Sequence, residues 1–192
     1  MKPIKEIAEI LFGVYAKERS TTGEVLYLQI GDFDANGNLV SGKDKSYINQ
    51  TEINNERQFL TSGDILLPAK GLKNTAFHIN EHHLPAVASS LFFVIRLQDT
   101  TILPQFLAIY LNQPATQSKI KAMISSTLTV PVLNKKEFQE LPVPIISLAE
   151  QKEIIQLHHI YQQERAITIQ LLEKKEQLFH GIFTQIITQD HV

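Results

Sequence analysis

The distribution of proline and glycine restricts this sequence of 192 residues more than any other feature does. All 8 prolines and 7 of the 8 glycines lie within the first 146 residues, and after Pro144 the next glycine is Gly181. Because both residue types interrupt helices, their absence predicts one continuous helix from about Leu148 to Ile187. We therefore expect two parts, a globule at 1–146 and a long helical segment at 147–192.

The apolar residues of this predicted helix gather on one side. At 100° per residue the main stripe lies within an arc of about 100°. It consists of Leu157, Ile160, Ile167, Leu171, Leu178, Ile182 and Ile186. A second row lies beside the first, formed by Ile154, Tyr161, Leu172, Phe179 and Phe183. The charged residues Glu164, Lys174 and Lys175 interrupt the stripe.

The length of the helix decides what its stripe can contact. At a rise of 1.5 Å per residue the helix is about 60 Å long, which exceeds the diameter of a 146-residue globule. Part of the helix then extends beyond its own domain, and we expect the stripe to pack as a coiled coil against a second copy or a partner. The alternative is a terminal helix that folds back on its own core.

The first part of the chain favours an α+β fold. Segments 25–30, 64–68 and 91–95 have the composition of strands, and 34–38 has that of a turn. A short helix is expected at 4–12, ending at Gly13.

Further helices are expected nearer the end of this part. One begins at Pro104, breaks at 112–114 and is followed by a second helix that runs towards Met123. Asn134 and Glu137 have the spacing of a capping box that opens a short helix before Pro142. The prediction is a β-rich α+β globule followed by one long helix.

Charge and composition exclude some classes of protein. The net charge is −2, and residues 1–146 hold 14 basic and 14 acidic side chains, so the basic surface of a typical free-standing DNA-binding protein is absent. Any DNA-binding face must arise from local clustering. The chain has no cysteine, which excludes disulfides and thiolate metal sites. With no apolar signal segment and no run of about 18 apolar residues, we expect a cytoplasmic protein without a membrane span.

The sequence contains no recognisable catalytic arrangement. Neither glycine-rich phosphate loop occurs, and no methyltransferase motif is visible. His78, His82 and His83 with Glu81 form the only metal-like cluster, but it lies in a proline-flanked strand or loop, which favours a polar hairpin edge over a metal site. The letters of a nuclease motif at 150–152 open the long helix and lack a strand context. We therefore predict no active site, no metal and no cofactor.

Four blocks resemble, in order and spacing, a target-recognition unit of the specificity subunits of type I restriction-modification enzymes. They are Gly63-Asp64-Ile65-Leu66-Leu67, Ala88-Ser89-Ser90, Leu103-Pro104-Gln105-Phe106-Leu107-Ala108-Ile109-Tyr110-Leu111-Asn112, and Leu141-Pro142-Val143-Pro144 with Leu148-Ala149-Glu150-Gln151-Lys152-Glu153-Ile154-Ile155. The resemblance implies a non-catalytic domain that reads double-stranded DNA, joined to a helix that forms an antiparallel coiled coil and docks methyltransferase (modification) subunits. S-adenosylmethionine and ATP would then be bound only by partner subunits.

Full-length members of this family carry two such units, whereas this sequence contains one and has no internal repeat. The resemblance therefore indicates a half-subunit that forms a homodimer through its helix and directs its partners to a symmetric bipartite target. A truncated remnant or a deliberately isolated unit are the alternatives. A second hypothesis, favoured by the neutral charge, is a coiled-coil scaffold protein that never binds DNA.

Cations and polar groups in loops are the candidates for contact with DNA. The predicted DNA-binding residues are Lys17, Arg19, Thr21, Lys43, Lys45, Lys70, Lys73 and Asn74. Arg19 is the preferred base reader because a guanidinium can donate two hydrogen bonds to one base. Lys119 and Lys121 form a further candidate pair. The alternative for each residue is an ordinary solvated surface charge.

Overall fold

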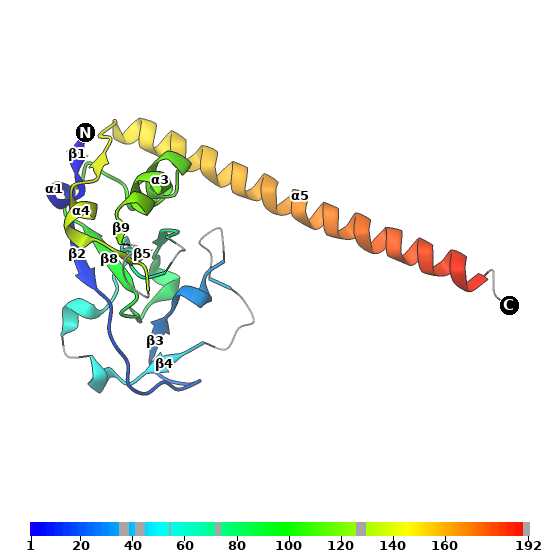
Figure 1. Cartoon of the computed structure of the whole chain (residues 1–192), viewed down its shortest axis with the longest axis horizontal. Coiled ribbons are helices and arrows are strands. Elements are labelled where there is room, and N and C mark those ends of the chain that lie inside the picture. The colour runs from blue at the N-terminus through cyan, green and yellow to red at the C-terminus, as the bar shows by residue number, and fades with distance from the viewer. Residues whose placement is uncertain (35–38, 41–44, 54, 72–73, 126–129, 190–192) are drawn as a thin grey trace. The chain divides into compact units, whose positions relative to one another are not determined.

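The computed structural model describes residues 1–34, 39–40, 45–53, 55–71, 74–125 and 130–189 (Figure 1). It contains two compact units, Met1–Gln151 and Lys152–Val192. The described strands are β1 (Lys2–Pro3), β2 (Ala8–Phe12), β3 (Val25–Leu28), β4 (Tyr47–Ile48), β5 (Ile65–Pro68), β6 (Phe77–His78), β7 (Ala86–Ala88), β8 (Phe92–Leu97), β9 (Ile124–Ser125), β10 (Val132–Leu133) and β11 (Pro142–Val143). The α-helices are α1 (Ile4–Ile7), α2 (Pro104–Leu111), α3 (Pro114–Ala122), α4 (Lys135–Gln139) and α5 (Leu148–Gln189).

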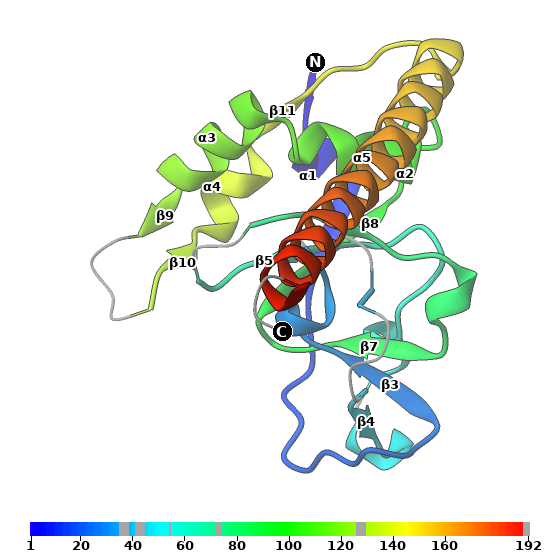
Figure 2. The same cartoon turned by 90° about the vertical axis from the view of Figure 1, so that its right-hand side faces the viewer.

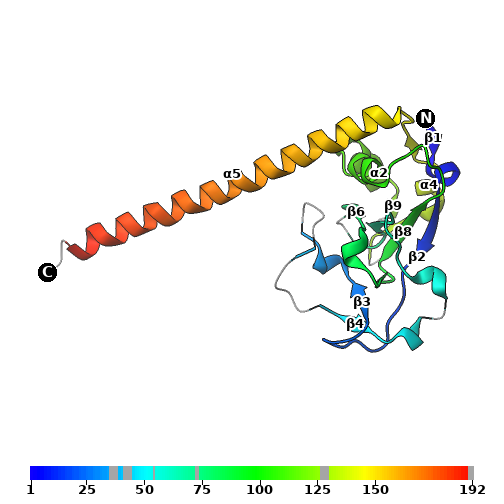
Figure 3. The ribbon, with the colours of Figure 1, turned by 180° about the vertical axis from the view of Figure 1, so that it is seen from behind.

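The first unit is built on a four-stranded antiparallel sheet with the order β2-β8-β5-β6. Figure 3 shows β2 and β8 side by side in this sheet. In the register, Ile10 faces Ile95 and Leu66 faces Val94. The strands predicted at 64–68 and 91–95 correspond to β5 and β8. Because β5 is buried along its whole length, the sheet forms the framework of the unit.

A second sheet has three strands in the order β4-β3-β7 (Figure 2). The β3 strand pairs antiparallel with β4 and parallel with β7. The strand predicted at 25–30 is shorter than expected, because a 3-10 turn begins at Ile30. The turn predicted at 34–38 lies mostly outside the described residues, although Phe33 and Leu39 on either side of it form an antiparallel bridge.

The chain passes between the two sheets at Gly13. Here the backbone N–H of Val14 donates to the carbonyl of Ala88 at 2.7 Å. A Cβ atom on Gly13 would lie 2.0 Å from the backbone oxygen of Ser89, so no other residue fits without displacing the backbone. The prediction that Gly13 ends a helix was wrong, and the glycine instead allows this close approach.

The helix expected at 4–12 was also wrong over most of its length. Only Ile4–Ile7 is helical, and Ala8–Phe12 forms strand β2. All five residues of β2 pair with β8, and Ile10 is buried in that position. Tertiary pairing with a buried strand therefore overrides the local preference of this segment for a helix.

Stacked and edge-to-face aromatic rings fill the space beneath the two sheets. The rings of Phe33 and Phe77 stack with centroids 4.1 Å apart, and Phe92 meets both rings at 6.1 Å edge to face. Leu28 from β3 and Leu66 from β5 belong to the same buried cluster. The two sheets thus share one hydrophobic core.

The predicted helices α2, α3 and α4 are confirmed. Pro104 and Pro114 occupy the first turns of α2 and α3. At these positions a backbone N–H would have no acceptor within the helix, so proline costs no hydrogen bond there. The Oδ1 of Asn134 accepts from the backbone N–H groups of Lys136 and Glu137 and so caps α4. Asn112, which follows α2, accepts from the N–H of Ala76 at 2.7 Å and donates to its carbonyl at 2.9 Å. This pair of bonds fixes α2 beside β6.

The α5 helix has 42 residues and confirms the predicted long helix. At its start, the Glu150 carboxylate accepts from the backbone N–H and the hydroxyl of Ser147, and the Ser147 Oγ accepts from the N–H of Glu150. These bonds hold the pKa of Glu150 below its usual range. No described helix combines the length and apolar character required to cross a membrane. The α+β fold class with a long C-terminal helix is confirmed.

Candidate nucleic-acid interface

Two of the predicted DNA-binding loops lie next to each other. The backbones of Ser20 and Tyr47 exchange two hydrogen bonds, of 3.0 and 2.9 Å, which join the loop of Arg19 to the segment that contains Lys45. Arg19 Nη1 donates to Gln29 Oε1 at 2.7 Å. Gln29 Nε2 in turn donates to Ser46 Oγ at 3.1 Å. The structure therefore brings these two candidate loops together through a chain of hydrogen bonds.

Arg19 is exposed but held in place. Its guanidinium carbon lies 5.8 Å from the centre of the Tyr27 ring, and the Tyr27 hydroxyl donates to the carbonyl of Val14 at 3.0 Å. Within the described residues, the guanidinium makes one hydrogen bond, to Gln29. An arginine positioned in this way keeps donors available for a phosphate or a base edge.

The neighbouring candidates Lys17 and Thr21 are also exposed. The backbone N–H of Lys17 donates to Glu52 Oε2 at 3.2 Å, which anchors the start of the loop. Lys45 is exposed too, whereas Lys43 lies outside the described residues.

The third loop, around Lys70, has a different neighbourhood. Lys70 forms an isolated antiparallel bridge with Val132, and the N–H of Gly71 donates to Pro131 at 2.9 Å. Gly71 has a φ of +95°, a conformation that favours glycine. Lys70 is exposed, and Lys73 lies outside the described residues. These bonds hold the loop against β10 and the residue before it.

Asn74 does not lie on the surface. It is 3% exposed, and its Nδ2 donates to the carbonyl of Pro68 at 2.9 Å. Its backbone carbonyl accepts from Gln117 Nε2 at 2.9 Å. Asn74 therefore supports the Lys70 loop from within the fold and presents no amide to solvent.

Four other cations of the first unit are paired with a nearby carboxylate. The described ion pairs are Lys2–Asp99, Lys5–Glu140, Arg57–Glu9 and Arg96–Asp64. Over the described part of the chain, the candidates Lys17, Arg19, Lys45 and Lys70 form no such pair. The same holds for Lys119, Lys121, Lys135 and Lys136, so the candidate loops hold four of the eight described cations of this unit that no described carboxylate pairs with.

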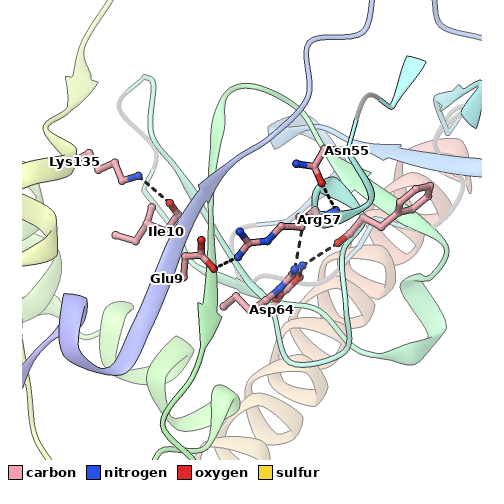
Figure 4. A network of polar contacts seen from close by, with 8 residues as sticks. Glu9, Ile10, Asn55, Arg57, Asp64 and Lys135 are labelled. Carbon is pink, nitrogen blue, oxygen red and sulfur yellow. Dashed lines mark hydrogen bonds and ion pairs between the residues drawn. The ribbon is translucent and has the colours of Figure 1, made fainter. Parts of the chain in front are cut away.

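The ion pair of Arg96 and Asp64 is the most enclosed of these (Figure 4). Asp64 is 1% exposed and accepts from Arg96 Nε at 2.8 Å and from Nη2 at 2.7 Å. Nη2 also donates to the carbonyl of Phe59 at 2.8 Å. The N–H of Thr61 completes the shell of the carboxylate. The hydrogen bonds to Asp64 hold the pKa of Arg96 above its usual range.

Lys135 lies on the other side of β2 in the same view (Figure 4). Its ammonium donates to the carbonyl of Ile10 at 2.9 Å and lies 4.8 Å from the centre of the Phe12 ring. Like Arg96, it ties separate elements of the fold together and is not a candidate for DNA contact.

The histidine cluster lines a shallow depression of 480 Å³. Its walls include Ser62, Gly63, His78, Asn80, Glu81, His82, Pro104 and Gln105. Within the described residues, no group of three or more His, Asp or Glu side chains is arranged to hold a metal ion. Burial lowers the pKa of His78, with a smaller contribution from His83. Burial also lowers the pKa of His83, with help from the charges of His82 and Lys45.

The predicted partner-binding residues lie on α5. They are Leu157, Ile160, Ile167, Leu171, Leu178 and Ile182, and their exposed fractions range from 48% at Ile182 to 68% at Leu157. Large apolar side chains exposed over so many turns are typical of a surface that binds another helix.

Gln151 is a structural residue that the sequence analysis did not recognise. It is completely buried, and its Oε1 accepts from the N–H of Leu103 at 2.8 Å. Its Nε2 donates to the carbonyls of Thr101 and Ile146 at 2.8 and 2.9 Å. Its only signal in the sequence is its place in the Glu-Gln-Lys block that carries the family resemblance.

Comparisons with known proteins agree with this fold. The S subunit of a type I restriction-modification system from M. genitalium covers 84% of this chain at 16% identity, with a TM-score of 0.58. The HsdS subunit from Thermoanaerobacter tengcongensis covers 86% at 17% identity, with a TM-score of 0.60. A chain from a study of complex assembly and conformational transition in the type I R-M system covers 86% at 19% identity, with a TM-score of 0.64. A comparison with curated proteins gave no match.

This chain spans 38%, 42% and 39% of the length of those three solved chains, respectively. The likeness therefore concerns one part of each larger protein. At these identities it establishes the shared fold, and the family must come from the sequence.

A family model described as the type I restriction modification DNA specificity domain matches residues 1–178, which is most of the sequence. Domains of this family are the non-catalytic specificity component of their systems and carry no cofactor, because S-adenosylmethionine and ATP belong to partner subunits. The match includes all four blocks of the resemblance and confirms it. This chain therefore belongs to the family of type I restriction-modification DNA specificity domains.

Proposed function

We propose that this chain chooses the DNA sequence at which a type I restriction-modification system acts. The family match over residues 1–178 is the observation that carries the proposal. The loop cations Arg19, Lys45 and Lys70 support it, because they are exposed and no described carboxylate pairs with them. Such cations can neutralise phosphates and release counterions, as DNA binding requires.

The two parts of the chain divide this work. Residues 1–146 read DNA through the loops that contain Lys17, Arg19, Thr21, Lys43, Lys45, Lys70 and Lys73. Arg19 is the base reader, because its guanidinium is fixed over Tyr27 and keeps donors available. Residues 147–192 bind partner chains. The protein acts in the cytoplasm, where the DNA and the partner subunits are present.

Two copies form the working unit in this proposal. The apolar side chains of α5 from Leu157 to Ile182 support this dimer, because they are exposed and offer a second copy a surface to bind. A homodimer joined by α5 supplies two recognition domains related by a two-fold axis, and such a dimer favours a symmetric bipartite target. The dimer then recruits methyltransferase subunits to that target.

Selection from a randomised duplex library tests DNA reading. The purified chain is mixed with a modification subunit of a type I system, and we expect enrichment of one bipartite sequence. Arg19→Ala should relax the preference at one base position, at a cost of about 1–3 kcal/mol there. Lys45→Ala and Lys70→Ala should weaken binding to all sequences and reduce the slope of log K against log salt by about 0.9 each.

Lys5→Ala is the matched control for these variants. It removes one exposed positive charge that is already paired with Glu140, so the salt dependence should remain close to that of the unaltered protein. A mixed complex with no sequence preference would contradict the proposal. If no duplex binding varies with salt under any partner condition, the coiled-coil scaffold hypothesis replaces it.

The dimer has a separate test in the apolar stripe. Leu171→Glu combined with Leu178→Glu places charges on two exposed stripe positions of α5. We expect the chain to elute as a monomer while its circular dichroism retains the signal of a folded globule. An unchanged elution volume would contradict dimerisation through this stripe.

A further inference from the structure

The α5 helix contains a second pattern within its apolar face. Eight positions alternate in steps of four and three residues, the spacing that keeps side chains on the seam of a two-stranded coiled coil. They are Leu157, Tyr161, Glu164, Thr168, Leu171, Lys175, Leu178 and Ile182. Six of the eight are uncharged, and one acid and one base stand at equal distances from the middle of the seam.

We propose that the antiparallel pair of helices implied by the family resemblance has a single register, in which Glu164 of each copy of α5 faces Lys175 of the other. This inference rests on the homodimer of the proposed function and deepens it by naming how the second copy binds. The two-fold axis of such a pair lies between Ile169 and Gln170 and generates the Glu–Lys contact twice.

Charge complementarity agrees with the antiparallel direction of the helices. In a parallel, unstaggered pair every seam residue faces its own equivalent, so Glu164 meets Glu164 and Lys175 meets Lys175. Like charges held together at a helix interface are unfavourable, and their repulsion grows as water is excluded. The antiparallel pair replaces both repulsive contacts with attractive ones.

The remaining seam residues fit the same register. When Glu164 faces Lys175, Leu157 faces Ile182 and Tyr161 faces Leu178. Thr168 faces Leu171 near the axis. Every apolar residue at the two ends of the seam therefore meets an apolar residue, and no charge is enclosed without an opposite charge.

Other antiparallel registers lack this agreement. A shift by one heptad in one direction places Glu164 opposite Ile182 and Lys175 opposite Leu171. A charge that faces an apolar residue in a closed interface loses its hydration without gaining a partner. The single Glu–Lys combination thus selects one register out of several that the apolar residues alone would permit.

Charge reversal in the full chain tests the register by sedimentation equilibrium. Glu164→Lys alone and Lys175→Glu alone each create two like-charge contacts per homodimer, and each should raise the dimer dissociation constant at least about tenfold. The double variant restores opposite charges and should recover the homodimer. An equimolar mixture of the two single variants should form a heterodimer about as tight as the unaltered dimer.

Lys174→Glu is the matched control, since it makes the same change of charge one residue away from the seam and should have little effect. In a parallel dimer the unaltered chain already contains two like-charge contacts, so the mixture of single variants would bind more tightly than the unaltered chain. That result would overturn the antiparallel arrangement, and so would a stronger effect of Lys174→Glu than of Lys175→Glu.

Disulfide formation gives an independent measurement, because the chain has no cysteine of its own. A mixture of Leu157→Cys and Ile182→Cys chains should form covalent dimers on mild oxidation. Leu157→Cys alone should not, and efficient cross-linking of that variant would indicate a parallel pair and overturn the proposal. A dimer whose dissociation constant is unchanged by every charge reversal would overturn the register alone. An unaltered chain that stays monomeric would instead contradict the homodimer of the proposed function.

Discussion

Two sets of polar side chains in residues 1–151 differ in the number of partners they have. Asp64, Asn112 and Gln151 are held by two or more hydrogen bonds each, and Asp64 and Gln151 are buried. Arg19 and Lys70 are exposed, and neither is paired with a carboxylate among the described residues. The first set belongs to the blocks that carry the family resemblance, which indicates that these blocks contain residues that stabilise the fold of the globule. The second set carries the proposed DNA contact.

The largest expected effect comes from removing one partner of a buried charge in the first set. Arg96→Ala leaves the Asp64 carboxylate buried without its two charged hydrogen bonds. Loss of one partner from such a pair lowers the free energy of unfolding by about 3–5 kcal/mol. Urea denaturation followed by circular dichroism measures this loss.

Arg57→Ala is the control, because the ion pair of Arg57 with Glu9 is largely exposed. An exposed pair contributes only about 0–1 kcal/mol. Equal losses of the free energy of unfolding in the two variants would show that the burial of Asp64 does not determine how much its ion pair contributes to stability.

A smaller effect is expected at the start of α5. Gln151→Ala removes the hydrogen bonds to Leu103, Thr101 and Ile146, and it leaves these backbone groups without that partner. The free energy of unfolding should fall by about 1–3 kcal/mol. Lys152→Ala, an exposed change at the next position, should stay within about 0.5 kcal/mol. If the two variants are equally stable, the side chain of Gln151 does not anchor the helix.

The difference between these sets also explains which elements could be predicted. The long helix and the break at 112–114 follow from proline and glycine, which act locally and therefore appear in the sequence. The segment Ala8–Phe12 was misassigned because its strand depends on pairing with β8, about 85 residues away along the chain. A local pattern contains no information about such a partner.

The candidate site shows the same division. The exposure of Arg19 and Lys70 agrees with their loop sequences, but the bonds that join the Arg19 loop to Ser46 depend on two strands that meet only in the fold. The amide of Asn74 and its position after a strand make it a candidate for contact with DNA. Its burial, however, depends on bonds to Pro68 and Gln117 that form only in the fold. Composition identifies polar loops, whereas the fold decides which of their side chains reach the surface.

The pH dependence of stability provides a further comparison. The pKa of His78 is below its ordinary value of 6.5 in the folded chain because burial disfavours the charged ring. Below pH 6.5 the unfolded chain binds a proton that the folded chain resists, so the free energy of unfolding should decrease as the pH falls from 7 to 5. His78→Gln should show a shallower decrease over this range in urea denaturation.

His180→Gln is the control for His78, because it alters an exposed histidine of α5. It measures how far a change from His to Gln at an exposed position alters stability by itself. A decrease as steep in His78→Gln as in the unaltered chain would show that another group titrates in this range.

The smallest expected effect on folding belongs to the loop cations, where the two sets are separated most clearly. Arg19→Ala, Lys45→Ala and Lys70→Ala combined in one chain should change the free energy of unfolding by no more than about 0.5 kcal/mol per substitution, because substitutions of exposed side chains usually stay within that range. The same chain should lose DNA affinity in the complex with a modification subunit. A large loss of stability would place these cations among the groups that hold the globule together, and the distinction between the two sets would then fail.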